Sequence, residues 1–386
     1  MIHKILNNLS FKENKRRYLN LKGIATRRYA YKGPDIIQVD LTDSCNSHCL
    51  LCWTHSPVIR KDKDIENTEL DCSTVKNFIS DIAKAGTKEI IFSGGGEPFA
   101  YVNIWEILEF TQKSNLAFRI NTNFTLLNKN DISRLLSFNN LLSLTVSVWA
   151  GEADLYIRLH NRDNDTFLKL KNNLKFLNAS KPPALHVRLF AIVNNMNYSG
   201  LRTLIDFASE TRCNAIEFGV PDVIPGLTDS LLLNKRQLKF LKQDFINMAD
   251  NCNSENFAVK VFNKDIFLKR ISSPRAYYGE YDSFIDKIPC YAGWVFLRLR
   301  ANGDLNSCLK SHRIPIGNIY EDDFFSVWNN SLQQEFRRKS LSIHKNKDYF
   351  RFIGNGNNGD VGCKRICDNA LVNKHLHRIL KYLFWI

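Results

Sequence analysis

The chain has 386 residues, of which 44% are hydrophobic and 12% aromatic. This composition builds a folded core and excludes a disordered chain. No apolar run is long enough to span a bilayer and no cleavable signal segment is recognisable, so we expect a cytoplasmic protein. The net charge of +14 is compatible with an anionic substrate, nucleic acid or a membrane surface. Because the cations are mostly scattered among acids, an ordinary basic surface is the simplest interpretation.

Residues 1–34 are strongly basic and carry short apolar groups at helical spacing. We predict a lead-in that packs against the main domain. An arm that contacts phosphate or a membrane is the alternative.

From residue 35 onward, strand-like and helix-like segments alternate, which predicts repeated βα units and a parallel sheet. The expected strands are 36–41, 88–92, 117–121, 142–148, 185–193 and 215–219. The expected helices are 73–85, 104–114, 131–138, 167–177 and 201–209. We assign residues 35–230 to this domain. In parallel α/β folds ligands bind where the strands end, so the loops after the strands are the first place to look for chemistry.

The loop after the first expected strand carries three thiols, Cys45, Cys49 and Cys52, in the pattern Cys-x3-Cys-x2-Cys. Thiolates at this density suit zinc or an iron–sulfur cluster. A structural zinc would need a fourth ligand close by, and the nearest candidates, His48 and His55, sit in no familiar zinc pairing. A cubane held by three cysteines leaves one iron open for chemistry.

The second expected strand ends in Ser93-Gly94-Gly95-Gly96-Glu97-Pro98. Together with the three-cysteine loop, this turn resembles the signature of the radical S-adenosylmethionine (SAM) superfamily. The resemblance implies a partial (β/α)6 TIM-like barrel, and a [4Fe–4S] cluster on the three thiols whose open iron binds SAM. One departure is Leu51, which stands where the family usually has an aromatic residue; Trp53 follows instead.

The resemblance also assigns SAM contacts, with the glycine turn taking the methionyl amino group. The implied SAM-binding residues are Gly94, Gly95, Gly96, Glu97, Pro98, Asn123, Ser147 and Arg188. Asn194 is a further candidate, and for the residues beyond the turn a structural role is an equal alternative. Glu217 and Asp222, near the end of the sixth strand, are candidates for substrate contact or proton transfer.

The last hundred residues carry a second set of cysteines, Cys290, Cys308, Cys363 and Cys367. The first two flank a predicted hairpin whose turn is Asn302-Gly303. The spacing resembles SPASM or twitch domains, which implies an auxiliary [4Fe–4S] cluster in a smaller α+β domain. Four cysteines would saturate one cluster, which favours electron transfer or structural support, and a four-thiolate zinc site is the alternative.

We place a connecting region at 231–285, the cysteine-rich domain at 286–373 and a basic, aromatic helix at 374–386, which either docks on the protein or contacts a membrane interface. Ten cysteines in a large chain without a secretion signal favour metal binding over disulfides. Cys72, Cys213 and Cys252 remain as spare thiols, for which burial in the core is the common role.

The resemblance implies that the enzyme reductively cleaves SAM to a 5′-deoxyadenosyl radical, with electrons from a flavodoxin- or ferredoxin-type donor. We expect hydrogen abstraction from a small or carbohydrate-like metabolite, with dehydrogenation or related C–H chemistry. A peptide- or protein-maturing enzyme is the first alternative. A non-enzymatic zinc or cluster protein that binds nucleic acid is the second, and the glycine turn argues against it.

Overall fold

The computed structural model describes residues 11–59, 68–252, 259–282, 285, 287–354 and 362–384. Within these residues the strands form one ten-stranded sheet, in the order β10-β9-β8-β1-β2-β3-β4-β5-β6-β7. The strands are β1 (Ile36–Asp40), β2 (Glu89–Ser93), β3 (Ala117–Thr122), β4 (Leu141–Ser147), β5 (His186–Ile192), β6 (Ala215–Gly219), β7 (Lys260–Phe262), β8 (Phe296–Leu299), β9 (Asp304–Asn306) and β10 (Gly317–Asn318).

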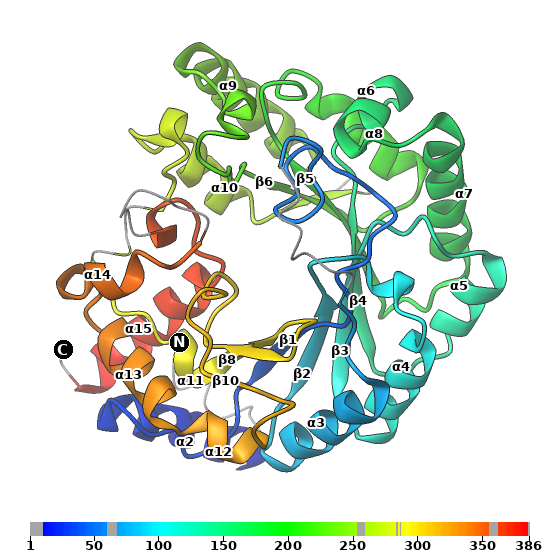
Figure 1. Ribbon diagram of the computed structural model, residues 1–386. Coiled ribbons are helices and arrows are strands. Elements are labelled where there is room, and N and C mark those ends of the chain that lie inside the picture. The colour runs from blue at the N-terminus through cyan, green and yellow to red at the C-terminus, as the bar shows by residue number, and fades with distance from the viewer. Residues whose placement is uncertain are drawn as a thin grey trace.

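Strands β1 to β7 are parallel to one another and make the curved wall of an open barrel (Figure 1). The six expected strands and the partial-barrel fold are therefore confirmed. Two features were not expected. Strand β7 lies in the region that we assigned as a connection, and it extends the wall beyond β6. The hairpin β8–β9 belongs to the same sheet, because β8 pairs in parallel with β1.

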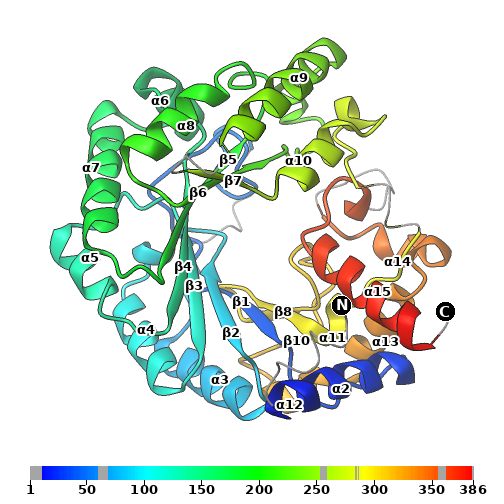
Figure 2. The same ribbon diagram turned by 180° about the vertical axis from the view of Figure 1, so that it is seen from behind.

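Helices cover the outside of this wall, and the C-terminal helices α13 to α15 lie beside β8 (Figures 1 and 2). The longer helices are α2 (Phe11–Thr26), α3 (Cys72–Lys84), α4 (Ile104–Lys113), α5 (Lys129–Leu135), α6 (Ala153–His160), α7 (Asn164–Ser180), α8 (Leu201–Glu210), α9 (Lys235–Cys252), α10 (Lys264–Ile271), α13 (Ser331–Ser340) and α15 (Ala370–Phe384). The short ones are α11 (Ala292–Val295), α12 (Phe324–Trp328) and α14 (Lys347–Phe350).

The alternation of side chains along the strands decides which of them reach the interior of the barrel. In β5, Val187, Leu189 and Ala191 are buried, whereas the intervening Arg188, Phe190 and Ile192 are half-buried. Successive side chains of a strand point to opposite faces. Phe190 and Ile192 line the cavity described below, so the half-buried side chains of β5 face the interior of the barrel. The buried side chains of β5 pack under the helices.

Both ends of the described chain are tied to the C-terminal region. Trp328 Nε1 donates to the Lys32 carbonyl at 2.7 Å, and the buried Arg337 donates to the carbonyls of Arg28, Gly293 and Trp328. At the other end, Asn373 of α15 accepts from Tyr291 N at 2.8 Å. Helix α15 thus packs against the segment that contains Tyr291. Trp385 and Ile386 lie outside the described residues, as do residues 1–10 of the lead-in.

Candidate active site

The three-cysteine loop and the glycine turn leave neighbouring strands at the same edge of the sheet and are bonded to each other. Gly96 N donates to the Thr42 carbonyl at 3.1 Å, and Glu97 N donates to the Ser44 carbonyl at 2.9 Å. A Cβ on Gly95 would lie 2.1 Å from Asp43 Oδ1, and one on Gly96 would lie 2.1 Å from the Ser44 carbonyl oxygen. The glycines are therefore required by the close approach of the cysteine loop.

Glu97 joins the glycine turn to the end of β3. Its carboxylate is 3% exposed and accepts from Asn123 N at 2.7 Å, from Thr122 Oγ1 at 2.5 Å and from Phe99 N at 3.3 Å. Burial raises the pKa of Glu97 to about 7, against the opposing effect of these donors. The side chain thus orients the turn, and buried Pro98 begins the short helical turn that follows.

Asn123 connects β3 to the cysteine loop. Its Nδ2 donates to Asn46 Oδ1 at 2.7 Å and lies 4.0 Å from Cys45 Sγ, while its Oδ1 accepts from Thr125 N at 3.0 Å. The structure therefore brings the side chain of Asn123 beside the thiol of Cys45. Ser147, the last residue of β4, is half-buried.

Arg188 and Asn194 are held by other protein groups. Arg188 Nε pairs with Glu217 Oε2 at 3.2 Å, and its Nη2 donates to Thr145 Oγ1 at 3.0 Å. Asn194 is fully buried, and its Oδ1 accepts from Met196 N at 2.9 Å in a local turn. These contacts favour the structural alternative for both residues over a contact with SAM.

Each thiol of the first loop has at least one nitrogen of the protein within hydrogen-bonding reach. Ser47 N points to Cys45 Sγ at 3.4 Å, His55 N to Cys52 Sγ at 3.2 Å, and the ring of His160 contacts Cys49 Sγ at 3.2 Å. Burial raises the pKa of all three thiols, that of Cys45 to about 12, and neighbouring thiols raise that of Cys49 further. Converging thiols that already have donors fit the ligands of a cluster, which would hold them as thiolates.

The four C-terminal cysteines also come together, around a small apolar cluster. All four pack against a group of buried side chains, namely Ile285, Phe336, Ile343, Phe350 and Ile353. Cys290 and Cys308 raise the pKa of Cys363, in addition to the effect of burial. Cys308 Sγ accepts from Lys310 N at 3.3 Å and Cys290 Sγ from Asn373 Nδ2 at 3.5 Å. This donor set again fits an iron–sulfur cluster.

In the described ranges, no three His, Cys, Asp or Glu side chains converge as ligands of one metal ion. A cubane takes one thiolate on each of its irons, so its ligand sulfurs lie further apart than those around a single ion.

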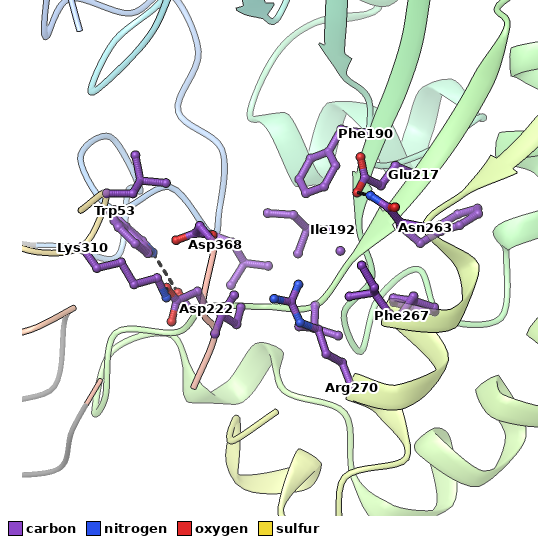
Figure 3. A pocket seen from close by; sticks show the side chains of 17 residues that line it. Trp53, Phe190, Ile192, Glu217, Asp222, Asn263, Phe267, Arg270, Lys310 and Asp368 are labelled. Carbon is purple, nitrogen blue, oxygen red and sulfur yellow. Dashed lines mark hydrogen bonds and ion pairs between the residues drawn. The ribbon is translucent and has the colours of Figure 1, made fainter. Parts of the chain in front are cut away.

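A cavity of about 240 Å³ lies at the carboxyl ends of β5 and β6, between the two groups of cysteines (Figure 3). Its walls include the sequence neighbours of Cys52, Cys308 and Cys367. The lining residues are Leu51, Trp53, Phe190, Ile192, Glu217, Phe218, Gly219, Val220, Asp222, Asn263, Ile266, Phe267, Arg270, Leu309, Lys310, Ile366 and Asp368.

Trp53 and Lys310 close one side of this cavity (Figure 3). Trp53 Nε1 donates to the Asp222 carbonyl at 2.9 Å, Lys310 Nζ pairs with the Asp222 carboxylate, and the ammonium lies 5.3 Å from the Trp53 ring centre. Burial raises the pKa of Asp222 and the Lys310 ammonium opposes that rise. Trp53 is thus held at the cavity wall.

The polar groups of the cavity are mostly paired. Arg270 Nη2 bonds Asp282 Oδ2 at 2.9 Å, and Glu217 Oε1 accepts from Asn263 Nδ2 at 2.7 Å. Among the described lining residues both cations, Arg270 and Lys310, are in ion pairs. Asp368 also lines the cavity, and its carboxylate lies on the side of Trp53 and Lys310.

Sequence reasoning missed His160, Lys310, Arg270 and Asp368. His160 lies in α6, a helix that we did not assign, although Tyr156, Leu159 and His160 have the spacing of one buried helical face. The other three reach the cavity only through the packing of segments far apart in the chain.

Comparison with known proteins agrees with this geometry. The Radical SAM superfamily model matches residues 39–208, which contain the cysteine loop and the glycine turn. Residues 39–208 are a radical SAM superfamily domain. The model of the SPASM iron–sulfur cluster-binding domain matches residues 290–349, so the chain also has a C-terminal SPASM domain. The two matches support two iron–sulfur clusters, one in each region. That result does not support the non-enzymatic alternative.

Two curated relatives come from Methanosarcina barkeri. An AdoMet-dependent heme synthase is 28% identical over 123 residues, covering 32% of this chain and 33% of the relative. An Fe-coproporphyrin III synthase is 26% identical over 187 residues, covering 47% of this chain and 43% of the relative. The matched segments thus span less than half the length of either relative.

Solved structures share the fold. Streptococcus suis SuiB bound to S-adenosylmethionine superposes with a TM-score of 0.59 at 18% identity, over 80% of this chain and 68% of that one. The structure of anSMEcpe with bound AdoMet gives a TM-score of 0.61 at 14% identity, over 90% of this chain and 96% of that one. Among the described residues of this chain, no helix is both long and apolar enough to cross a bilayer.

Proposed function

We propose that this enzyme removes a hydrogen atom from a small or carbohydrate-like substrate held in the cavity between the two cysteine groups, and that the substrate is oxidised there. The observation that carries the proposal is the composition of the cavity wall. Leu51 and Trp53 flank Cys52, Leu309 and Lys310 follow Cys308, and Ile366 and Asp368 flank Cys367. A substrate in this space touches neighbours of ligands of both proposed clusters.

The proposed ligands are Cys45, Cys49 and Cys52 for the first cluster and the four C-terminal cysteines for the second. A cluster on the first three thiols would supply the electron for reductive cleavage of SAM to methionine and the 5′-deoxyadenosyl radical. The protein's own contribution is to hold the substrate C–H in place and to exclude water. A cluster on the second group of cysteines would accept the electron that leaves the substrate radical, and the proton lost with it would pass to a carboxylate of the cavity such as Glu217.

The volume and lining of the cavity support a small substrate. Its volume of about 240 Å³ lies below the range of about 300–1,000 Å³ that is usual for drug-sized ligands. This space suits one small molecule, or one side chain of a larger one, better than a whole tetrapyrrole of the kind that the curated relatives are named for. Glu217 and Asp368 offer carboxylates that can accept hydrogen bonds from substrate hydroxyl or amino groups.

The charge pattern does not favour an anionic substrate, because both cations of the lining already have acidic partners. We further infer a reducing, cytoplasmic setting with a flavodoxin- or ferredoxin-type donor, since the cluster ligands must stay reduced to bind iron.

The test is deuterium transfer. The enzyme is reconstituted anaerobically with iron and sulfide and incubated with SAM, dithionite and perdeuterated candidates, with polyols and amino sugars in one arm and short peptides in the other. The proposal expects deuterium in 5′-deoxyadenosine with a member of the first arm, together with loss of two hydrogens from that substrate. Deuterium transfer from peptides alone would instead assign the peptide-maturing function.

A further inference from the structure

The end of helix α6 contacts the three-cysteine loop at three places. Leu50 N donates to the Leu159 carbonyl at 3.0 Å, the ring of His160 contacts Cys49 Sγ at 3.2 Å, and Arg162 donates to the Asn46 carbonyl. Neither the sequence motifs nor the proposed function gives this segment a role in the chemistry. The ring of His160 lies directly against Cys49, a proposed cluster ligand.

The hydrogen bonds of His160 fix which ring nitrogen carries the proton. The backbone N–H of Trp149 donates to His160 Nε2 at 3.1 Å. A nitrogen that accepts an N–H donor has no proton of its own, so the imidazole carries its proton on Nδ1. Nδ1 is the atom that faces Cys49 Sγ. The contact is therefore an N–H···S hydrogen bond in which His160 is the donor.

The ring is held so that it cannot turn away from the sulfur. His160 is 1% exposed and stacks on Tyr156, with ring centres 4.4 Å apart and planes at 28°. The ring of Trp149 also packs against His160, with ring centres 4.9 Å apart. A donor fixed in a buried, poorly polarisable setting acts more strongly on a nearby charge than one in water.

We propose that His160 is a positioning residue that sets the reduction potential of the first cluster by donating a hydrogen bond to the Cys49 sulfur. This inference rests on the proposed role of Cys49 as a cluster ligand. One-electron reduction adds negative charge to a cluster and its thiolates, and a donor to a ligand sulfur stabilises the more negative state. His160 thus makes the cluster easier to reduce by the external donor.

The test compares four full-length proteins: the wild type, H160F, H160N and Y156F. H160F removes the donor, whereas the amide of H160N can place an N–H near the position of Nδ1. Y156F is the matched control, because Tyr156 packs on the same ring and its hydroxyl has no hydrogen-bond partner among the described residues. Each protein is reconstituted anaerobically, its iron is counted, and its clusters are titrated in the presence of redox dyes by electron paramagnetic resonance.

The signal of the first cluster is identified as the one that changes when SAM is added. We expect H160F to keep its iron but to show a reduced-to-oxidised ratio about tenfold lower at a fixed solution potential, equivalent to 59 mV for one electron. H160N recovers most of this ratio, and Y156F matches the wild type.

An unchanged potential in H160F with full iron would overturn the inference, as would an equal shift in Y156F. If H160F folds by circular dichroism but lacks the SAM-sensitive cluster, His160 is a structural support or a ligand and the inference also fails. A wild type that shows no SAM-sensitive signal would overturn the proposed function and this inference together.

Discussion

Arg298 is the residue whose loss should most disturb the connection between the two cysteine groups. It lies on β8 and bonds Asp40 at the end of β1, with Nε at 2.7 Å and Nη2 at 2.5 Å from Asp40 Oδ2. Its Nη1 donates to the Leu309 carbonyl at 2.6 Å, next to Cys308. Arg298 thus joins the end of β1, which leads into the three-cysteine loop, to the segment that carries Cys308.

The cost of losing this side chain follows from the burial of its partner. The Asp40 side chain is 2% exposed, and its remaining side-chain partner within the described ranges is Gln38 Nε2 at 2.9 Å. Removing one partner of a buried ion pair costs about 3–5 kcal/mol, because the other charge remains buried without compensation. We therefore expect R298M to lower the free energy of unfolding by about 3–5 kcal/mol.

The assay is urea unfolding of the iron-free, reduced protein, followed by tryptophan fluorescence and circular dichroism. The matched control is R300M, since Arg300 pairs with Asp304 at 3.4 Å with its side chain 30% exposed, and an exposed pair contributes about 0–1 kcal/mol. Adding D40N to R298M should restore part of the lost free energy of unfolding. A loss in R298M within 1 kcal/mol of that in R300M would refute the reasoning.

Three further predictions follow from the site. G96A should abolish SAM cleavage and destabilise the fold, because its Cβ would lie 2.1 Å from the Ser44 carbonyl oxygen. The control is G200A, whose Cβ would lie 3.7 Å from the Asn197 carbonyl oxygen. G200A should have the urea midpoint of the wild type. Burial raises the pKa of Glu97 from 4.5 to about 7, so the folded state binds this proton more tightly than the unfolded state does. The free energy of unfolding should therefore fall by about 3 kcal/mol as the pH rises from 4.5 to 7. E97Q should flatten the profile of urea midpoints against pH, and an unchanged slope would contradict this. Iron counts should fall by about four per chain in both C49A and C363A, but SAM cleavage by dithionite should disappear only in C49A.

The strands and the cysteine loop could be predicted because their signals are local. Apolar runs bounded by turn residues mark the strands, and the fixed spacing of Cys45, Cys49 and Cys52 marks the ligand set without reference to the rest of the chain. The glycine turn was found for the same reason. Its close contact with Asp43 and Ser44 explains why Gly95 and Gly96 stand there.

The parts that could not be predicted depend on contacts between distant segments. The pairing of β8 with β1 joins the hairpin to the barrel sheet, and nothing in residues 296–299 indicates that partner. Trp53 is another case, because its orientation is set by Asp222 and Lys310, which lie far along the chain. Helix α6 was missed because it is short, with eight residues, although it supplies the ring that contacts Cys49.

The most direct measurement of the central claim is the formation of 5′-deoxyadenosine and methionine from SAM by the reconstituted protein under dithionite, with chromatographic detection and without added substrate. We expect both products in equal amounts from the wild type and neither from C49A. If the wild type binds iron at both cysteine groups and still forms no 5′-deoxyadenosine, or if C49A forms as much as the wild type, the assignment of the three-cysteine loop as the catalytic centre is contradicted.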